Sequence, residues 1–159
     1  MALAKGTNSY VDVTEADAYL ANRLAATEWA AAITADKERA LITATGILDD
    51  LSWVGSVISD SQSLAFPRIG SYFDPALGCD VLLPDGAVPE RVQKATFELA
   101  LHLYLNQDVL TDSGSVRNLN VSGIGLNTII GPSRLPSTIK RIIRPLLENQ
   151  GNNSWWRAN

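Results

Sequence analysis

The chain has 159 residues, of which 46% are hydrophobic and 19% are charged, and its formal net charge is −4. This length fits one domain, and the apolar content excludes a mostly disordered chain. No apolar run approaches the roughly 20 residues of a membrane helix, and Lys5 and Gly6 interrupt any signal-peptide core. We therefore expect a soluble cytoplasmic product without a membrane partner.

Charge is distributed unevenly along the chain. Residues 134–159 contain five basic side chains and one acidic side chain, a net charge of +4, whereas residues 1–133 contain 8 basic and 16 acidic side chains, a net charge of −8. An acidic body with a basic end suits head-to-tail contacts between copies or docking on an acidic partner, and a chance asymmetry on a solvated surface stays open. The basic residues of the C-terminal part are Arg134, Lys140, Arg141, Arg144 and Arg157.

The first predicted elements are a short arm and two helices. Residues 1–9 are small and polar and are expected to form a flexible arm. A helix is predicted over 14–24, with Thr14 as its N-cap, and residues 27–33 are expected to form a short helical turn. Apolar residues at three- and four-residue steps predict a second long helix over 35–51.

In the middle of the chain, the residues typical of helices give way to residues typical of turns. Glycine and proline residues are spread over 52–88, where 71–73 and 79–83 are predicted to pair as a small β-hairpin. A third helix is predicted over 89–108. It is apolar around most of its circumference, so we expect it to be the core helix and to meet a neighbouring copy with its remaining apolar surface. Gly46, in the helix before this region, costs about 1 kcal/mol relative to alanine, and a close helix crossing would explain its presence.

The last third of the chain combines a polar loop with one more helix. Residues 111–135 are rich in glycine and serine and are expected to form an extended loop with β-compatible pieces at 116–121 and 126–130. A fourth helix is predicted over 136–149. Pro145 should kink it, because proline offers no N–H and its ring displaces a carbonyl of the preceding turn.

The predicted fold class is mainly α, a helical bundle of about four helices with a small β-hairpin element and a long loop. The helical domain spans 10–150, between the N-terminal arm and a flexible C-terminal tail at 151–159. No internal repeat is evident in the sequence.

Residues that could carry catalysis are sparse. His102, the single histidine, lies mid-helix among apolar residues, and Cys79, the single cysteine, lies in a predicted strand without a base nearby. Both fit buried structural roles. Asp49 and Asp50 are helix neighbours that point about 100° apart and are expected to lie on the exposed end of their helix. We therefore expect no enzymatic activity, no metal and no cofactor.

The C-terminal Trp155-Trp156-Arg157 is the most distinctive local feature. These residues follow a Gly-Asn-Asn-Ser linker, and tryptophan and arginine commonly anchor interfaces. The favoured interpretation is a peptide that docks into a groove on another chain. A tail folded against its own domain, or a disordered end, stays open.

Several short motifs follow one another along the first two thirds of the chain. They are Tyr10-Val11-Asp12-Val13, Trp29, Lys37-Glu38-x-Ala40-Leu41, Trp53-x-Gly55, Leu64-x-Phe66-Pro67-Arg68 and Val88-Pro89-x-x-Val92. With these motifs, the chain resembles over about residues 8–105 the head–tail connector (head-completion adaptor) proteins of long-tailed phages, and related sequences also carry the label of a DnaT-like single-stranded-DNA-binding protein.

The resemblance implies a structural virion protein that forms a ring, commonly a dodecamer, between the portal protein and the tail-side neck or tail-completion proteins. DNA would pass through without sequence-specific binding, and the protein would lie in the virion neck after assembly in the host cytoplasm. Trp155, Trp156 and Arg157 stand at the end that reaches the portal in that family. The residues that this reading places at contacts between subunits or with partners are Arg117, Arg134, Lys140, Arg141 and Arg144.

The alternative function is single-stranded-DNA binding. That activity needs aromatic stacking platforms in a basic groove, which Trp155, Trp156 and the basic helix over 136–149 would supply on a small scale. A sequence pI of about 4.9 weighs against it, because domains that coat nucleic acid are usually basic. The main prediction from the sequence is therefore a connector subunit.

Overall fold

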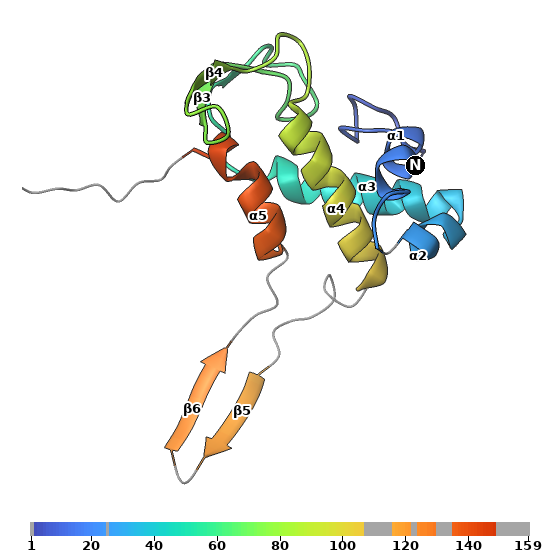
Figure 1. Cartoon of the computed structure of the whole chain (residues 1–159), viewed down its shortest axis with the longest axis vertical. Coiled ribbons are helices and arrows are strands. Elements are labelled where there is room, and N and C mark those ends of the chain that lie inside the picture. The colour runs from blue at the N-terminus through green and yellow to red at the C-terminus, as the bar shows by residue number, and fades with distance from the viewer. Residues whose placement is uncertain (1, 25, 107–115, 122–123, 130–134, 149–159) are drawn as a thin grey trace, which may run out of the picture.

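The computed structural model describes residues 2–24, 26–106, 116–121, 124–129 and 135–148. Within these residues the fold is mainly α, as predicted, and small two-stranded sheets accompany the helices (Figure 1). No helix in these ranges is long and apolar enough to cross a membrane. The helices are α1 (Val13–Leu20), α2 (Ala26–Ala31), α3 (Thr34–Asp49), α4 (Glu90–Leu105), α5 (Ser137–Ile143) and the 3-10 helix η2 (Arg144–Leu146).

The strands of the described residues form three antiparallel pairs. The pairs are β1 (Ser56–Val57) with β2 (Arg68–Ile69), β3 (Ser71–Asp74) with β4 (Cys79–Leu82), and β5 (Val116–Val121) with β6 (Ile124–Ile129). The β3–β4 pair is the predicted hairpin. The β5–β6 pair is formed by the β-compatible pieces of the predicted loop over 111–135, so this loop contains a hairpin of its own.

Residues 4–9 of the predicted arm form a turn before α1. The Gly6 N–H donates to the Ser9 carbonyl at 2.7 Å, and the Ala4 N–H donates to Asn8 Oδ1 at 2.7 Å. Ser9 is fully buried, so the chain already contacts the body of the protein at this residue.

Asp12 is the N-cap of α1, in place of the predicted Thr14. Its carboxylate accepts a hydrogen bond from the Glu15 N–H at 2.8 Å, and the Glu15 carboxylate accepts one from the Asp12 N–H at 3.0 Å. This capping box satisfies two N–H groups at once and requires a Glu or Gln three residues after the cap. The residue three positions after Thr14 is Asp17, which instead accepts hydrogen bonds from Trp29 Nε1 and Lys37 Nζ.

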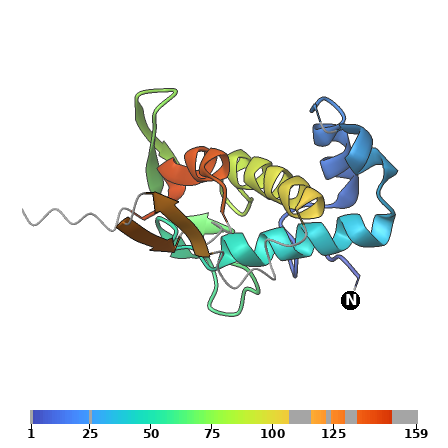
Figure 2. The ribbon, with the colours of Figure 1, turned by 90° about the horizontal axis from the view of Figure 1, so that it is seen from below.

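The core is built mainly by α3, α4 and α5, which pack together with α4 in contact with both of the others (Figure 2). α4 is the core helix, as predicted, and its buried side chains run from Val92 to Leu103. α3 contributes Leu41 and Leu48, and α5 contributes Ile139. Burial of side chains of this kind stabilises the fold by about 1.5–3 kcal/mol each, so these helices form the rigid frame.

Gly46 does not mark a close helix crossing. It is exposed on α3, and a Cβ built on it would meet no atom of the described residues within 4 Å. The prediction of a crossing at this position is wrong, because no neighbouring helix approaches the backbone there.

The Trp-x-Gly and Phe-Pro-Arg motifs hold the β1–β2 turn against the core. The rings of Trp53 and Phe66 are both buried and meet edge to face, with centroids 5.0 Å apart. The Arg68 guanidinium donates to the carbonyl oxygens of Val54 at 2.9 Å and Trp53 at 3.2 Å. Gly55 has a φ of +75°, and a Cβ there would stand 2.2 Å from the Ile69 carbonyl oxygen.

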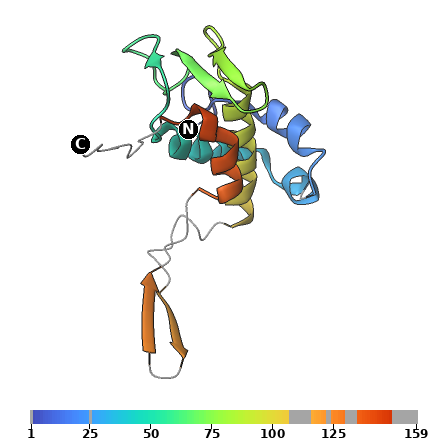
Figure 3. The same cartoon turned by 60° about the vertical axis from the view of Figure 1, so that its left-hand side comes forward.

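The last helix is shorter than the predicted range of 136–149. α5 ends at Ile143 and continues as η2, because Pro145 offers no N–H to the carbonyl of the preceding turn. The chain then leaves helical geometry, and the Glu148 N–H donates to the Ser52 carbonyl at 2.9 Å. Figure 3 shows α5 alongside α4, with the β3–β4 hairpin beyond the C-terminal end of α5.

Candidate functional site

Three exposed cations follow one another on α5 and η2. Lys140, Arg141 and Arg144 are each exposed, and within the described residues their side chains form no ion pair and no hydrogen bond. Lys140 and Arg144 are four residues apart, so they lie on neighbouring turns of one helix face. Their positive charge is therefore available to a ligand.

The other cations with described side chains are engaged within the protein. Arg68 donates to backbone carbonyl groups, as given above. Among the side chains that the structure describes, the free positive charge is therefore concentrated on α5 and η2. The remaining cations form the ion pairs Lys5–Glu15, Arg23–Glu98, Lys37–Asp17, Arg39–Asp36, Arg91–Asp74 and Lys94–Glu90.

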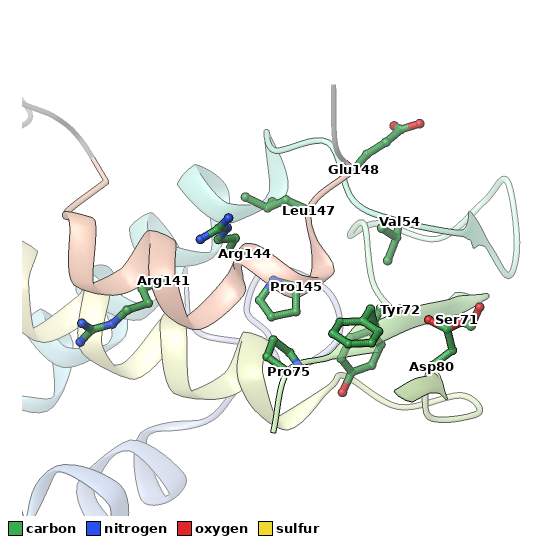
Figure 4. Close-up of a pocket in the computed structure, with 11 residues that line it drawn as sticks. Val54, Ser71, Tyr72, Pro75, Asp80, Arg141, Arg144, Pro145, Leu147 and Glu148 are labelled. Carbon is green, nitrogen blue, oxygen red and sulfur yellow. The ribbon is translucent and has the colours of Figure 1, made fainter. Parts of the chain in front are cut away.

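Two hollows meet at these cations and together form what we call the α5 groove, and Figure 4 shows the first of them. Arg141, Arg144 and Leu147 line both hollows. The first hollow has a volume of about 610 Å³ and lies between the β3–β4 hairpin and η2. The second has a volume of about 460 Å³ and combines Lys140 with the apolar side chain of Leu51.

Aromatic and proline rings form the hairpin side of the first hollow. Tyr72 is half-buried, and Phe73, with 55% of its surface exposed, presents its ring to solvent. Figure 4 shows Tyr72 and Pro75 on the hairpin side, with Pro145 facing them from η2. Planar rings beside free guanidinium groups suit a ligand that has both a flat apolar part and negative charge.

Asp74 fixes the hairpin to the helices. Its carboxylate accepts a hydrogen bond from the Ala76 N–H at 2.8 Å and pairs with the Arg91 guanidinium of α4 at 2.9 Å. The hydrogen bond from Ala76, followed by the contact with Arg91, lowers the pKa of Asp74 below its usual value. Arg91 also donates to the Ile142 carbonyl of α5 at 3.4 Å, so one ion pair joins the hairpin, α4 and α5.

The first hollow also contains two carboxylates. Asp80 of β4 and Glu148 both line it, and in the described part of the chain their side chains have no ion pair or hydrogen-bond partner. They do not neutralise Arg141 or Arg144, which line the same hollow. The hollow therefore presents unpaired charges of both signs.

Backbone contacts hold Glu148 at this place. The Val54 N–H donates to the Leu146 carbonyl at 3.0 Å, and Trp53 and Leu147 form an antiparallel bridge. Together with the Glu148 N–H bond to Ser52, these contacts align residues 146–148 with the segment that contains Trp53. A short stretch without helical structure is thus fixed at the edge of the α5 groove.

The other candidate residues lie apart from the groove. Cys79 is exposed, so the prediction that it is buried is wrong. At the C-terminal end of α3, Asp50 is exposed, as predicted, whereas Asp49 is half-buried and accepts hydrogen bonds from the Tyr10 hydroxyl and from the Ala65 N–H. His102 is half-buried on α4, and the described residues contain no group of three or more His, Cys, Asp or Glu side chains that could hold a metal ion.

The structure brings together only part of the residues proposed from the sequence. Lys140, Arg141 and Arg144 share the α5 groove, and Arg117 lies on β5. Sequence reasoning did not identify Tyr72, Phe73 or Asp80, although the adjacent aromatic residues of the predicted hairpin were a visible signal. The residues Arg134, Trp155, Trp156 and Arg157 lie outside the described residues.

The chain was compared with protein families, curated proteins and solved structures. A family model with the description “Putative DnaT-like ssDNA binding protein” matches residues 2–158. No curated protein matches the chain. No solved structure matches it.

This match corrects the main prediction from the sequence. The reading as a phage head–tail connector, with a structural and portal-binding role in virion assembly, is wrong, because the matching family is described by single-stranded-DNA binding. The alternative reading agrees with the family. The expected portal, tail-side and self-association partners and the virion location derive from the connector resemblance alone, and they stay predictions.

Proposed function

The chain belongs to the family described as “Putative DnaT-like ssDNA binding protein”, and we propose that it binds single-stranded DNA along the α5 groove and catalyses no reaction. The observation that carries this proposal is the concentration of unpaired cations, Lys140, Arg141 and Arg144, on one face of a chain with a net charge of −4. A polyanion is attracted at that face and repelled by the acidic remainder, so its position on the protein is restricted.

The arginines provide the phosphate contacts in this proposal. Arg141 and Arg144 border both hollows, so a strand that passes from one hollow to the other meets both guanidinium groups. A guanidinium group donates two parallel hydrogen bonds to phosphate oxygens, and it does so without reading the base sequence. Each phosphate contact also releases counterions, so affinity should decrease as salt increases.

The rings of β3 provide the base contacts. Phe73 is exposed and Tyr72 lines the same hollow, so an unpaired base has an aromatic face on which to stack. Such stacking contributes about 1–3 kcal/mol per base and is available only to bases outside a duplex. The groove should therefore prefer single strands to duplex DNA of the same length.

The test is a comparison of two triple variants that lose the same charge. The first is K140A/R141A/R144A, which removes the free cations, and the control is K5A/R39A/K94A, which removes cations already paired with carboxylates. Binding of a fluorescent single strand of about 15 nucleotides, a length within the usual site sizes, is measured by anisotropy at low salt. We expect the first variant to lose at least about tenfold in affinity and the control to lose much less, because each phosphate contact adds to binding.

The two variants separate a local effect from a change in net charge. Equal losses in both would show that the strand senses only the overall charge, and an unchanged affinity of the first variant would remove the α5 groove as the site. An unlabelled duplex of the same length serves as competitor and should displace the strand poorly. Circular dichroism of both variants checks that they remain folded.

A further inference from the structure

We infer that the first hollow discriminates among bases, with Asp80 and Glu148 accepting hydrogen bonds from exocyclic amino groups. The groove would then prefer strands rich in cytosine to strands rich in uracil or thymine. This inference rests on the proposed function and adds a base preference to it.

Two carboxylates line the hollow at which we propose that phosphates bind. Asp80 and Glu148 are unpaired within the described residues, as are Arg141 and Arg144, and all four line the same hollow. A carboxylate beside a phosphate path repels the strand and lowers its affinity. A ligand that supplies both phosphate oxygens and N–H donors removes that penalty, and a nucleotide with an amino group on its base supplies both.

The hairpin register places Asp80 beside an aromatic ring. Phe73 of β3 is directly opposite Asp80 of β4, so both side chains project from the same face of the hairpin. Cβ atoms of such cross-strand pairs lie about 5 Å apart. A base that stacks on the Phe73 ring therefore has its edge near the Asp80 carboxylate.

Glu148 lies on the other side of the same hollow. Its backbone N–H is bonded to the Ser52 carbonyl at 2.9 Å, which fixes the main chain from which the side chain extends. Figure 4 shows Asp80 with Tyr72 on the hairpin, and Glu148 next to Leu147 beyond η2. Asp80 and Glu148 thus line the first hollow from two different elements.

The chemistry of the base edges gives the direction of the preference. Cytosine presents the N4 amino group, a donor, at the position where uracil and thymine present the O4 carbonyl, an acceptor. A carboxylate accepts from the amino group and repels the carbonyl oxygen. Cytosine and uracil differ only at this edge and have no methyl group, so they form the sharpest pair of probes.

The experiment measures the affinity of the full chain for deoxycytidine and deoxyuridine oligomers of about 15 nucleotides each. We expect the wild-type protein to bind the cytosine oligomer about tenfold more tightly, within the range for one specific base contact. Asp80→Ala should reduce this ratio toward unity and bind the uracil oligomer at least as tightly as the wild type does, because a repelling charge is removed. Asp80→Asn should bind the uracil oligomer better than wild type, since its amide donates to O4.

Asp85→Ala is the matched control. Asp85 is exposed and does not line the hollow, so its removal changes the net charge by the same amount and should leave the cytosine-to-uracil ratio unchanged. Equal binding of both oligomers by the wild-type protein would overturn the base preference and leave single-stranded-DNA binding intact. Absence of binding to either oligomer at low salt would instead overturn the proposed function.

Discussion

Two glycines of this chain differ in whether their position requires glycine. Gly46 is an exposed residue of α3 with space for a methyl group, whereas Gly55 combines a φ of +75° with a carbonyl oxygen where its Cβ would stand. The first glycine only costs helix stability, and the second is required by the turn that carries Trp53.

Gly46→Ala should therefore stabilise the protein. Alanine loses less backbone entropy in a helix than glycine does, so we expect the free energy of unfolding to increase by about 0.5–1 kcal/mol. Gly55→Ala should instead decrease it by more than about 1 kcal/mol, because alanine tolerates neither the positive φ nor the contact with Ile69. Urea denaturation measures both changes in the free energy of unfolding. A destabilised Gly46→Ala protein would contradict the expectation that α3 has space for a methyl group at this position.

The motif residues on which the resemblance to phage connectors rests mostly lie in the core or bind the backbone. Trp29, Trp53 and Phe66 are buried, and Arg68 bonds to backbone carbonyl groups. Such residues specify how a chain folds, and one fold hosts many functions. This is the physical reason why those motifs led to the wrong function while the fold class was predicted correctly.

At the scale of elements, the Asp74 carboxylate, which accepts from the Ala76 N–H and pairs with Arg91, makes the attachment of the β3–β4 hairpin sensitive to acid. Because the pKa of Asp74 is lowered in the folded protein, the unfolded chain binds a proton at this carboxyl more readily than the folded chain does. The stabilisation is present above the unfolded value near 3.8 and is lost as the pH decreases through the folded pKa.

Asp74→Asn should remove this contribution. We expect the variant to be less stable than wild type near pH 6, and the difference in unfolding free energy to shrink as the pH decreases below 3.8 and through the lowered pKa of Asp74, where the wild-type carboxyl also becomes protonated. Denaturation curves at several pH values measure the difference. A difference that stays constant across this range would show that the Asp74 charge does not stabilise the fold.

The elements were predictable where local patterns decide them. Periodic apolar residues located α3 and α4, and two short β-compatible segments among glycine and proline residues located the β3–β4 hairpin. Pro145 marked a break in the last helix, but the end of α5 could not be located in this way, because the apolar pattern continues to Leu147 and the bridge between Leu147 and Trp53 fixes the chain outside helical geometry. A contact between residues so distant in sequence leaves no local signal.

Only the part of the candidate site that is formed by residues close together in the sequence could be predicted. Lys140, Arg141 and Arg144 are close together in the chain, so their cluster could be read directly. Tyr72 and Asp80 join them only because the β3–β4 hairpin packs against η2. Which cations are already neutralised by carboxylates also depends on the fold.

At the scale of the whole molecule, the fold determines which of the charged side chains are available to a ligand. A pI of about 4.9 predicted poor binding to nucleic acid. Among the described side chains, however, the cations outside α5 and η2 contact carboxylates or carbonyl groups, whereas those of α5 and η2 are unpaired. A protein of this kind should bind a strand at one place and remain unattached elsewhere. Net charge describes the average surface and is a poor guide to such a local face.

The most direct measurement of this account is the salt dependence of single-strand binding by the wild-type chain. Three phosphate contacts, from Lys140, Arg141 and Arg144, predict that the logarithm of the binding constant decreases with the logarithm of salt concentration with a slope of about −2. A slope near that value, reduced toward zero in K140A/R141A/R144A, is the predicted result. No detectable binding at low salt, or binding that is indifferent to salt, would contradict the account.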